Sequence, residues 1–417
     1  MKKKLFFMAS MIVCLKVGAQ VSTFKTIDSL TSIGRYQKAL VLLNELPETY
    51  IKNKKIASVY ESIDNYKRAT GFYEKALSLK ENDVLKLKLG KIHIRLNQFN
   101  KAIALLEEIV DKDKDNLLAK YLLGKLYLKT NQIKKAVTFF KELKRADNTN
   151  ANYPYYLGLV YQKLKKRNLK IDNFLEAYRR DNQHIKAIEK LALAYRVLRD
   201  RDSSNLFVNK GLKVVPNHIN LNKLKINDFF REKKYKEAIR LLKKIDSIKP
   251  NEHYTYKMLG KSYYEIEELD SAKMYFSKAL KLDRSDFKSY IFLGSIYFEE
   301  KDLQNASMNY LMATIVGKEP RDQAHLGMAN VFFEQKKPKR VIEQYKKAIA
   351  ENRNNYKALY LLANFSDNYY EDKKVAYKYY QRYIDRFERK DSLFTVNAER
   401  RIKEIKKEHF LKGEILE

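Results

Sequence analysis

Side chains that could carry out catalysis or bind metal are spread thinly along this sequence. The six histidines are His93, His184, His218, His253, His325 and His409. A metal site needs several ligands close together, so histidines that occur singly predict none. Adjacent acids such as Glu107 and Glu108 diverge on a helix and make a poor pair for acid–base catalysis. The motifs G-x-x-x-x-G-K-[ST], H-E-x-x-H and G-x-S-x-G are absent. We therefore expect no catalytic, cofactor-binding or metal-binding residues and no enzymatic activity.

Small and aromatic residues recur along the chain at intervals of 34 residues. The Leu-Gly pairs at 89–90, 123–124 and 157–158 are each 34 apart, and the pairs at 259–260 and 293–294 resume the series. Twelve residues beyond the glycine lies a second series of small residues, which includes Ala102, Ala136 and Ala272. Within each repeat the apolar residues follow helical spacing, and Asn-Gln pairs mark turns between two helices. This pattern predicts pairs of helices that stack to bury one continuous core.

The pattern resembles the tetratricopeptide repeat family, with W-x2-L-G-x2-Y, then A-x3-F-x2-A, then P. The resemblance implies an all-α fold, an α-solenoid of stacked antiparallel helix pairs. It covers residues 20–390 as about eleven repeats, and residues 391–417 are expected to form a C-terminal capping helix. The chain has no Trp, so the first position of the family motif is filled by other residues.

One face of each first helix is free to meet a partner. If the glycine is repeat position 8, positions 4, 7, 8 and 11 face the second helix, and positions 2, 5, 9, 12 and 13 face away from it. The resemblance implies that these opposite faces line a groove. The predicted partner-binding residues are Lys91, Arg95, Tyr121, Lys125, Lys129, Tyr155, Lys163, Arg231, Lys257, Lys261, Glu265 and Glu299. Position 13 is largely basic as far as Arg231 and acidic from Glu265, so we expect a ligand whose two ends carry opposite charges.

The composition limits the classes of partner. The chain has 417 residues, with 84 Lys+Arg against 51 Asp+Glu and a net charge of +33. Such an excess attracts acidic protein segments, nucleic acid or anionic lipid. The sole cysteine, Cys14, excludes disulfide frameworks and Cys-rich metal sites.

The N-terminal residues predict export. Lys2, Lys3 and Lys4 precede an apolar stretch from Leu5 to Leu15, and Val17-Gly18-Ala19 provides a cleavage site before Gln20. Residues 1–19 therefore predict a signal peptide, and the mature chain is expected in the periplasm or envelope of a bacterium. The residues before Cys14 do not fit a lipoprotein cleavage site.

Three functional classes remain after these observations. We expect a non-catalytic scaffold that binds a partner protein or peptide, most simply one with an acidic segment. A nucleic-acid-binding helical-repeat protein is the first alternative, although export and the lack of a repeated two-residue code oppose it. A peripheral envelope protein held to anionic lipid by its basic surface is the second. The sequence gives no oligomeric state.

Overall fold

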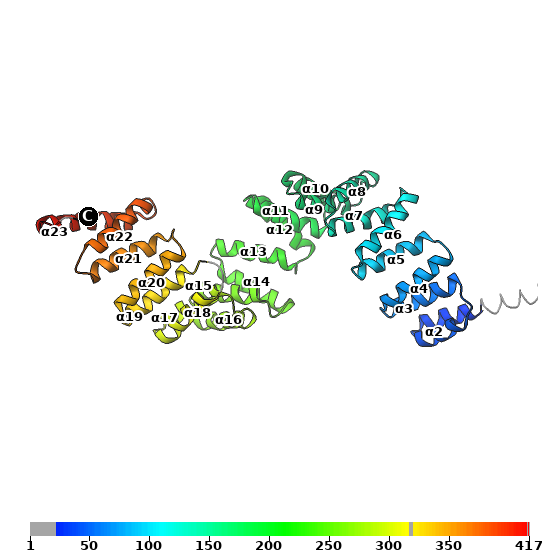
Figure 1. Ribbon diagram of the computed structural model, residues 1–417, viewed down its shortest axis with the longest axis horizontal. Helices are drawn as coiled ribbons and strands as arrows, with labels where there is room; N and C mark the ends of the chain where they lie inside the picture. Colours follow the sequence, from blue (N-terminus) through cyan, green and yellow to red (C-terminus); the bar gives the residue numbers. More distant parts are fainter. Residues whose placement is uncertain (1–21, 317–319, 415, 417) are drawn as a thin grey trace, which may run out of the picture. The chain divides into compact units, whose positions relative to one another are not determined.

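The computed structural model describes residues 22–316, 320–414 and 416, and every regular element within these ranges is an α-helix (Figure 1). The predicted signal peptide and its cleavage site lie outside the described residues. The chain forms two compact units. The first ends at Val214 and the second begins at Val215. We call them unit 1 and unit 2.

Unit 1 is a series of helix pairs that pack in chain order. Residues 22–32 are helical and precede the first of the elements named here. The first helices of the following pairs are α3 (Tyr50–Ser62), α5 (Asp83–Arg95), α7 (Leu117–Lys129), α9 (Asn152–Lys163) and α11 (Ile185–Val197). The second helices are α2 (Tyr36–Glu45), α4 (Tyr66–Leu79), α6 (Phe99–Lys112), α8 (Ile133–Ala146), α10 (Arg167–Arg180) and α12 (Arg201–Val214).

Unit 2 repeats this arrangement. Its first helices are α13 (Ile219–Arg231), α15 (His253–Glu265), α17 (Phe287–Glu299), α19 (Asp322–Glu334) and α21 (Tyr356–Tyr369). Its second helices are α14 (Tyr235–Ile248), α16 (Leu269–Leu282), α18 (Leu303–Ile315), α20 (Pro338–Glu351) and α22 (Lys374–Phe387). In both units each second helix also contacts the first helix of the next pair. The predicted all-α solenoid of stacked helix pairs is confirmed.

The turn within each pair, except the turn between α21 and α22, has one recurring hydrogen-bond pattern. After α5, Asn97 N–H donates to the carbonyl of Ile94, and Gln98 N–H donates to the carbonyl of His93. This is a Schellman motif, in which one residue takes a positive φ. That residue is Asn97 here, with φ of 58°, and Lys165 and Glu267 occupy the equivalent place in later pairs. The repeated turn places the residues that follow the first helix at equivalent positions in these pairs.

Small residues let the two helices of a pair approach closely. Ala102, Ala136, Ala238 and Ala272, on the second helices α6, α8, α14 and α16, are fully buried. The apolar side chains around them form extended clusters, each built from several neighbouring pairs. A single pair could not bury its apolar face alone, which explains why the core continues from repeat to repeat.

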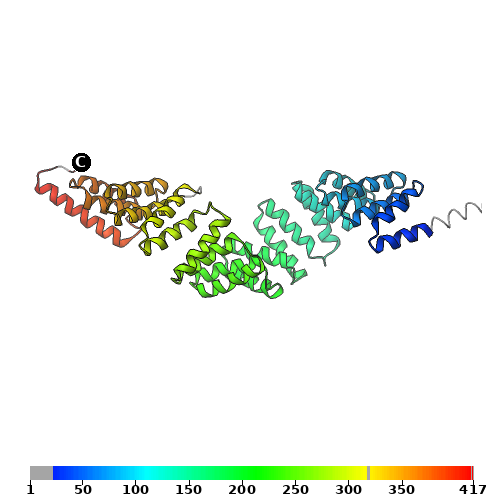
Figure 2. The ribbon, with the colours of Figure 1, turned by 90° about the horizontal axis from the view of Figure 1, so that it is seen from below.

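The helix predicted near Ser392 to Leu411 is present as α23 (Ser392–Leu411), and it packs on α22 (Figure 2). Arg401 of α23 makes two hydrogen bonds to the buried carboxylate of Asp367 on α21, at 2.6 and 3.1 Å. Charge-assisted bidentate pairs of this kind are among the stronger side-chain contacts in proteins. This pair therefore ties the last helix of the described chain to the helix pair before it.

Candidate partner-binding surface

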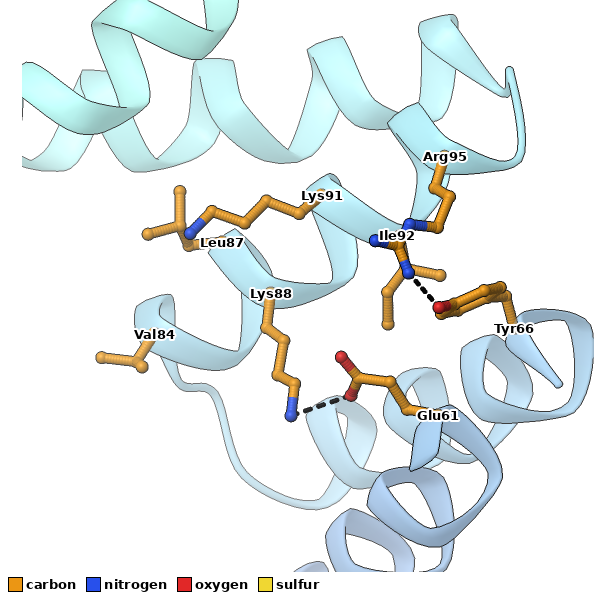
Figure 3. Close-up of a pocket in the computed structure, with 8 residues that line it drawn as sticks. All are labelled: Glu61, Tyr66, Val84, Leu87, Lys88, Lys91, Ile92 and Arg95. Carbon is orange, nitrogen blue, oxygen red and sulfur yellow. Dashed lines mark hydrogen bonds and ion pairs between the residues drawn. The ribbon is translucent and has the colours of Figure 1, made fainter. Parts of the chain in front are cut away.

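Unit 1 has a hollow of about 510 Å³ on the face of α5 that points away from its pair (Figure 3). Four of its lining residues are Val84, Leu87, Lys91 and Arg95, at repeat positions 2, 5, 9 and 13. The helical geometry used in the sequence analysis assigned these positions to one face, and the structure places them along one hollow. Lys91 and Arg95, both predicted partner-binding residues, lie together there.

Charged and aromatic side chains from the preceding pair close one side of this hollow. Lys88 forms an ion pair with Glu61 at 2.8 Å. The guanidinium group of Arg95 stacks 4.7 Å from the ring centre of Tyr66 and donates a hydrogen bond to its hydroxyl group. The cation of Arg95 is thus held at the rim, while Lys91 remains exposed. The hollow can receive an anionic group beside the apolar surface of Val84 and Leu87.

Further along unit 1, lysines stand over aromatic rings. The ammonium group of Lys125 lies 5.2 Å from the ring centre of Tyr121 and 5.5 Å from that of Tyr156. Lys129 lies 4.4 Å from the ring centre of Phe99. Tyr121 is half-buried, and burial raises the pKa of its hydroxyl group. These contacts fix the direction of Lys125 and Lys129, whereas Lys163 is simply exposed.

Tyr155 is the predicted partner-binding residue whose placement the structure corrects. It is 7% exposed and packs against the rings of Phe174 and His184, with centroids 5.8 and 5.0 Å away. Burial raises the pKa of its hydroxyl group to about 12. Tyr155 therefore belongs to the core, because Phe174 of its own pair and His184 at the start of the next pair cover it.

Unit 2 has a hollow of about 490 Å³ that three successive first helices line. Its apolar wall comes from Met258 on α15 and from Ile291 and Phe292 on α17. The basic residues at this hollow are Lys257, Lys261 and Lys288, and Asp322 and Gln323 of α19 lie at its far side. A ligand with an apolar side chain next to a carboxylate could place the side chain against the apolar wall and the carboxylate beside the lysines.

Two of these lysines are oriented by neighbouring side chains. Lys257 donates a hydrogen bond of 2.6 Å to Asp286, which is 7% exposed and also accepts from Ser289 at 2.7 Å. Burial acts to raise the pKa of Asp286, but the hydrogen bonds from Lys257 and Ser289 outweigh it and hold the pKa below its ordinary value. Lys261 stands 5.1 Å from the ring centre of Phe230.

The remaining predicted residues of unit 2 lie at the ends of first helices. Arg231 forms an ion pair with Asp228 at 2.8 Å. Glu299 accepts a hydrogen bond of 3.0 Å from the Tyr264 hydroxyl group, and burial together with this bond raises the Tyr264 pKa to about 12. Glu265 is exposed. The structure thus brings Lys257 and Lys261 together at one hollow and leaves Glu265 and Glu299 at the helix ends.

Sequence reasoning missed the part of the hollow that α17 contributes. Lys288, Ile291 and Ser295 occupy repeat positions 2, 5 and 9, which are the positions already assigned to the partner-facing side. Reading those positions through α17 would have found them. Phe292 is at position 6, which was not assigned to that side, so it could not be found in this way. Its ring stacks on Phe276, with centroids 4.9 Å apart, and lines the hollow.

The described residues show neither a metal-binding cluster nor a membrane-spanning helix. No three His, Cys, Asp or Glu side chains in the described ranges gather as a metal ion would require. Within the same ranges, no helix has both the length and the apolar character that crossing a bilayer demands.

Comparison with solved structures finds other helical proteins at low sequence identity. The crystal structure of yeast Tom70 matches over 94% of this chain and 97% of its own, with 15% identity and a TM-score of 0.43. The structure of Pseudomonas aeruginosa PilF matches over 52% of this chain and 98% of its own, with 15% identity and a TM-score of 0.44. No curated protein matches the sequence significantly.

Three protein-family models match parts of the sequence. Two are described as tetratricopeptide repeat and match residues 97–159 and 254–286. The third is described as the fourth ARM domain of tetratricopeptide repeat protein 21 and matches residues 53–122. The matched segments contain the helix pairs and the 34-residue interval seen in both units. The chain therefore carries tetratricopeptide repeats in both units.

Proposed function

We propose that this protein is a non-catalytic scaffold that binds a segment of a partner protein on the outward faces of its first helices. The tetratricopeptide fold is that of a protein–protein interaction scaffold, and solenoids of this type present extended binding surfaces. The observation that carries the proposal is the unit 2 hollow, because three successive repeats contribute to it. Its apolar wall and lysines suit an acidic segment with an apolar anchor.

Two kinds of side chain in the unit 2 hollow contribute to binding in different ways. Met258, Ile291 and Phe292 offer buried contact to an apolar anchor, which supplies most of the affinity. Lys261 and Lys288 attract and orient the acidic residues, which mainly raises the association rate. The unit 1 hollow beside Lys91 and Arg95 offers a second surface of the same chemistry.

We place this scaffold in the envelope of a bacterium after export. The basic start, the apolar stretch and Val17-Gly18-Ala19 support this location. N-terminal sequencing of the mature protein, taken from fractionated cells, is expected to begin at or near Gln20. A cytoplasmic chain that retains Met1 would contradict the location, and it would favour the nucleic-acid alternative.

Crosslinking in intact cells tests the binding surface. A photoreactive residue at position 291 is expected to capture a protein with an acidic segment. Capture should fall in the variant Lys261→Glu with Lys288→Glu. It should persist in the matched control Lys244→Glu with Lys281→Glu, which reverses exposed charges on second helices of the same unit. Equal loss in both variants would show that only bulk charge matters, and capture of nucleic acid would replace the proposal.

A further inference from the structure

Two neighbouring turns of unit 2 carry an unusual concentration of acidic residues. The turn from α15 to α16 holds Glu265, Glu267, Glu268 and Asp270, and the turn from α17 to α18 holds Glu299, Glu300 and Asp302. Lys301 is the one basic residue within these two stretches. We call this surface the acidic edge. It stands out in a chain whose net charge is +33.

The fold uses some of these acids. Lys273 forms ion pairs with Asp270 at 3.1 Å and with Glu300 at 2.6 Å, and the Asp302 side chain caps α18 by accepting a hydrogen bond from the N–H of Asn305. Glu267 and Glu268 are exposed, and Asp270 is 98% exposed. Glu265 and Glu299 are the last residues of α15 and α17, where the helix dipole disfavours negative charge. At the position of Glu267, other repeats have residues such as Asn97, Lys165 and Arg199. Local contacts therefore explain only part of the acidic edge.

Two neighbouring turns of unit 1 carry the opposite charge. The turn from α7 to α8 holds Lys129, Lys134 and Lys135, and the turn from α9 to α10 holds Lys163, Lys165, Lys166 and Arg167. No acidic residue lies within either stretch. All of these basic residues are exposed. We call this surface the basic edge.

The two edges match in position as well as in charge. Glu267 and Lys165 are the positive-φ residues of their turns, with φ of 62° and 56°. Glu268 and Lys166 follow them. Each donates its N–H, at 3.0 Å, to the carbonyl of a tyrosine in the last turns of the preceding helix, Tyr263 for Glu268 and Tyr161 for Lys166. Adjacent turns are separated by one 34-residue repeat in both edges. Charges on the two edges therefore recur with the same spacing.

From this match we infer that the acidic edge of one molecule binds the basic edge of a second copy of the same chain. The contact is heterologous, since two acidic edges or two basic edges would repel each other. Each molecule keeps one edge unoccupied after a single contact, so further copies can add head to tail. A second copy is the occupant because this chain itself supplies the complementary surface with the matching spacing.

Ionic strength decides whether this contact forms. An exposed ion pair contributes little on its own, so the contact depends on several pairs acting together. The overall positive charge opposes association, but distant charges are largely screened at about 0.15 M salt, where the Debye length is about 8 Å. Charges in direct contact are screened less. Association is therefore expected at physiological salt and is lost near 1 M.

Sedimentation of the purified full chain tests the inference with two charge-reversal variants. One is Lys165→Glu with Lys166→Glu, and the other is Glu267→Lys with Glu268→Lys. Each copies residues that other repeats already hold at the same positions, so folding is preserved and circular dichroism verifies it. The association constant of each variant alone is expected to fall at least about tenfold from that of the wild type, because attractive pairs become repulsive.

Mixing the two variants gives the decisive result. In an equimolar mixture the unchanged acidic edge of the first variant meets the unchanged basic edge of the second, and the reversed residues of the two variants also carry unlike charges. Association is therefore expected to return towards that of the wild type, with the two variants alternating along the assembly. The control Lys141→Glu with Arg145→Glu, on the exposed face of α8, should associate as the wild type does.

Three results would overturn the inference. The wild type could remain monomeric at every concentration at about 0.15 M salt. The mixture could remain monomeric although both variants are folded. The control could lose association as completely as the two edge variants, which would leave bulk charge as the cause.

Discussion

Gly158 on α9 lies directly against the ring of Phe174 on α10, so that a Cβ atom at residue 158 would be 2.6 Å from two of its carbon atoms. The same relationship joins Gly124 to Phe140, and Gly260 to Phe276. Where the first helix has Ala192 instead of glycine, the residue 16 positions later is Val208. The size of one side chain thus compensates for the other within a pair.

This relationship predicts the effect of adding one methyl group. Gly158→Ala should destabilise unit 1 by about 1–3 kcal/mol, because the methyl group overlaps a fully buried ring. Adding Phe174→Val should recover part of the loss, since it recreates the pairing of Ala192 with Val208. Urea unfolding of the single and double variants measures this coupling. Strictly additive effects would show that the two residues do not share the space.

The positive-φ residues of the turns predict a gain in stability. Lys233 has φ of 56°, a conformation that costs most residues other than glycine about 1–2 kcal/mol. Lys233→Gly should therefore stabilise unit 2 by about 0.5–1 kcal/mol after the backbone entropy of glycine is subtracted. Asn131→Gly in unit 1 is the comparison, and its gain should be smaller because asparagine tolerates this conformation. A larger gain at Asn131 would contradict this explanation.

Lys170 occupies the position that other second helices fill with a buried alanine or serine, such as Ala136 and Ser204. It is half-buried, and burial lowers its pKa, with further lowering from Arg167 and Lys190. Lys170→Ala should stabilise unit 1 by roughly 0.5–2 kcal/mol at pH 7, as measured by urea unfolding. Amide hydrogen exchange should be faster in residues 165–205 than in residues 255–315 of the wild type.

The pH dependence of this gain has a definite sign. Because the folded pKa of Lys170 lies below its ordinary value of 10.5, the unfolded chain binds more protons between the two values. The stability of the wild type therefore rises with pH in that window, and the advantage of Lys170→Ala should shrink there. An advantage that grows with pH would contradict the assignment.

The ionisation of Asp286 makes the free energy of unfolding of unit 2 depend on pH in the acid range. Its pKa lies below the ordinary value of 3.8, so the stabilisation is complete above that value and is lost as the pH falls through the folded pKa. Asp286→Asn should lower the stability of unit 2 by about 1–3 kcal/mol at pH 7, since Lys257 loses a charged partner. Near pH 3 the difference from the wild type should be smaller. An equal difference at both pH values would mean that the charge of Asp286 is not involved.

The sequence by itself determined the helix pairs and most of the residues that share a face. The 34-residue interval and the 3.6-residue helical period are local properties, so they placed Lys91 with Arg95 and Lys257 with Lys261 correctly. Helix-to-helix spacing also follows locally, because Gly158 and Phe174 lie on consecutive helices. These features depend on residues close together in the chain.

The tertiary structure decided which of those residues remain available. Tyr155 is covered by Phe174 and His184, and Lys257 is engaged by Asp286 of the following repeat. The exposure of a side chain depends on how the neighbouring helices pack and on how long their side chains are. The helical period of the sequence predicts neither of these. The same packing brings Ile291 and Phe292 beside Met258 to form the unit 2 hollow. Periodicity predicts which residues share a helix face, whereas packing between successive repeats determines how much of that face is exposed to solvent.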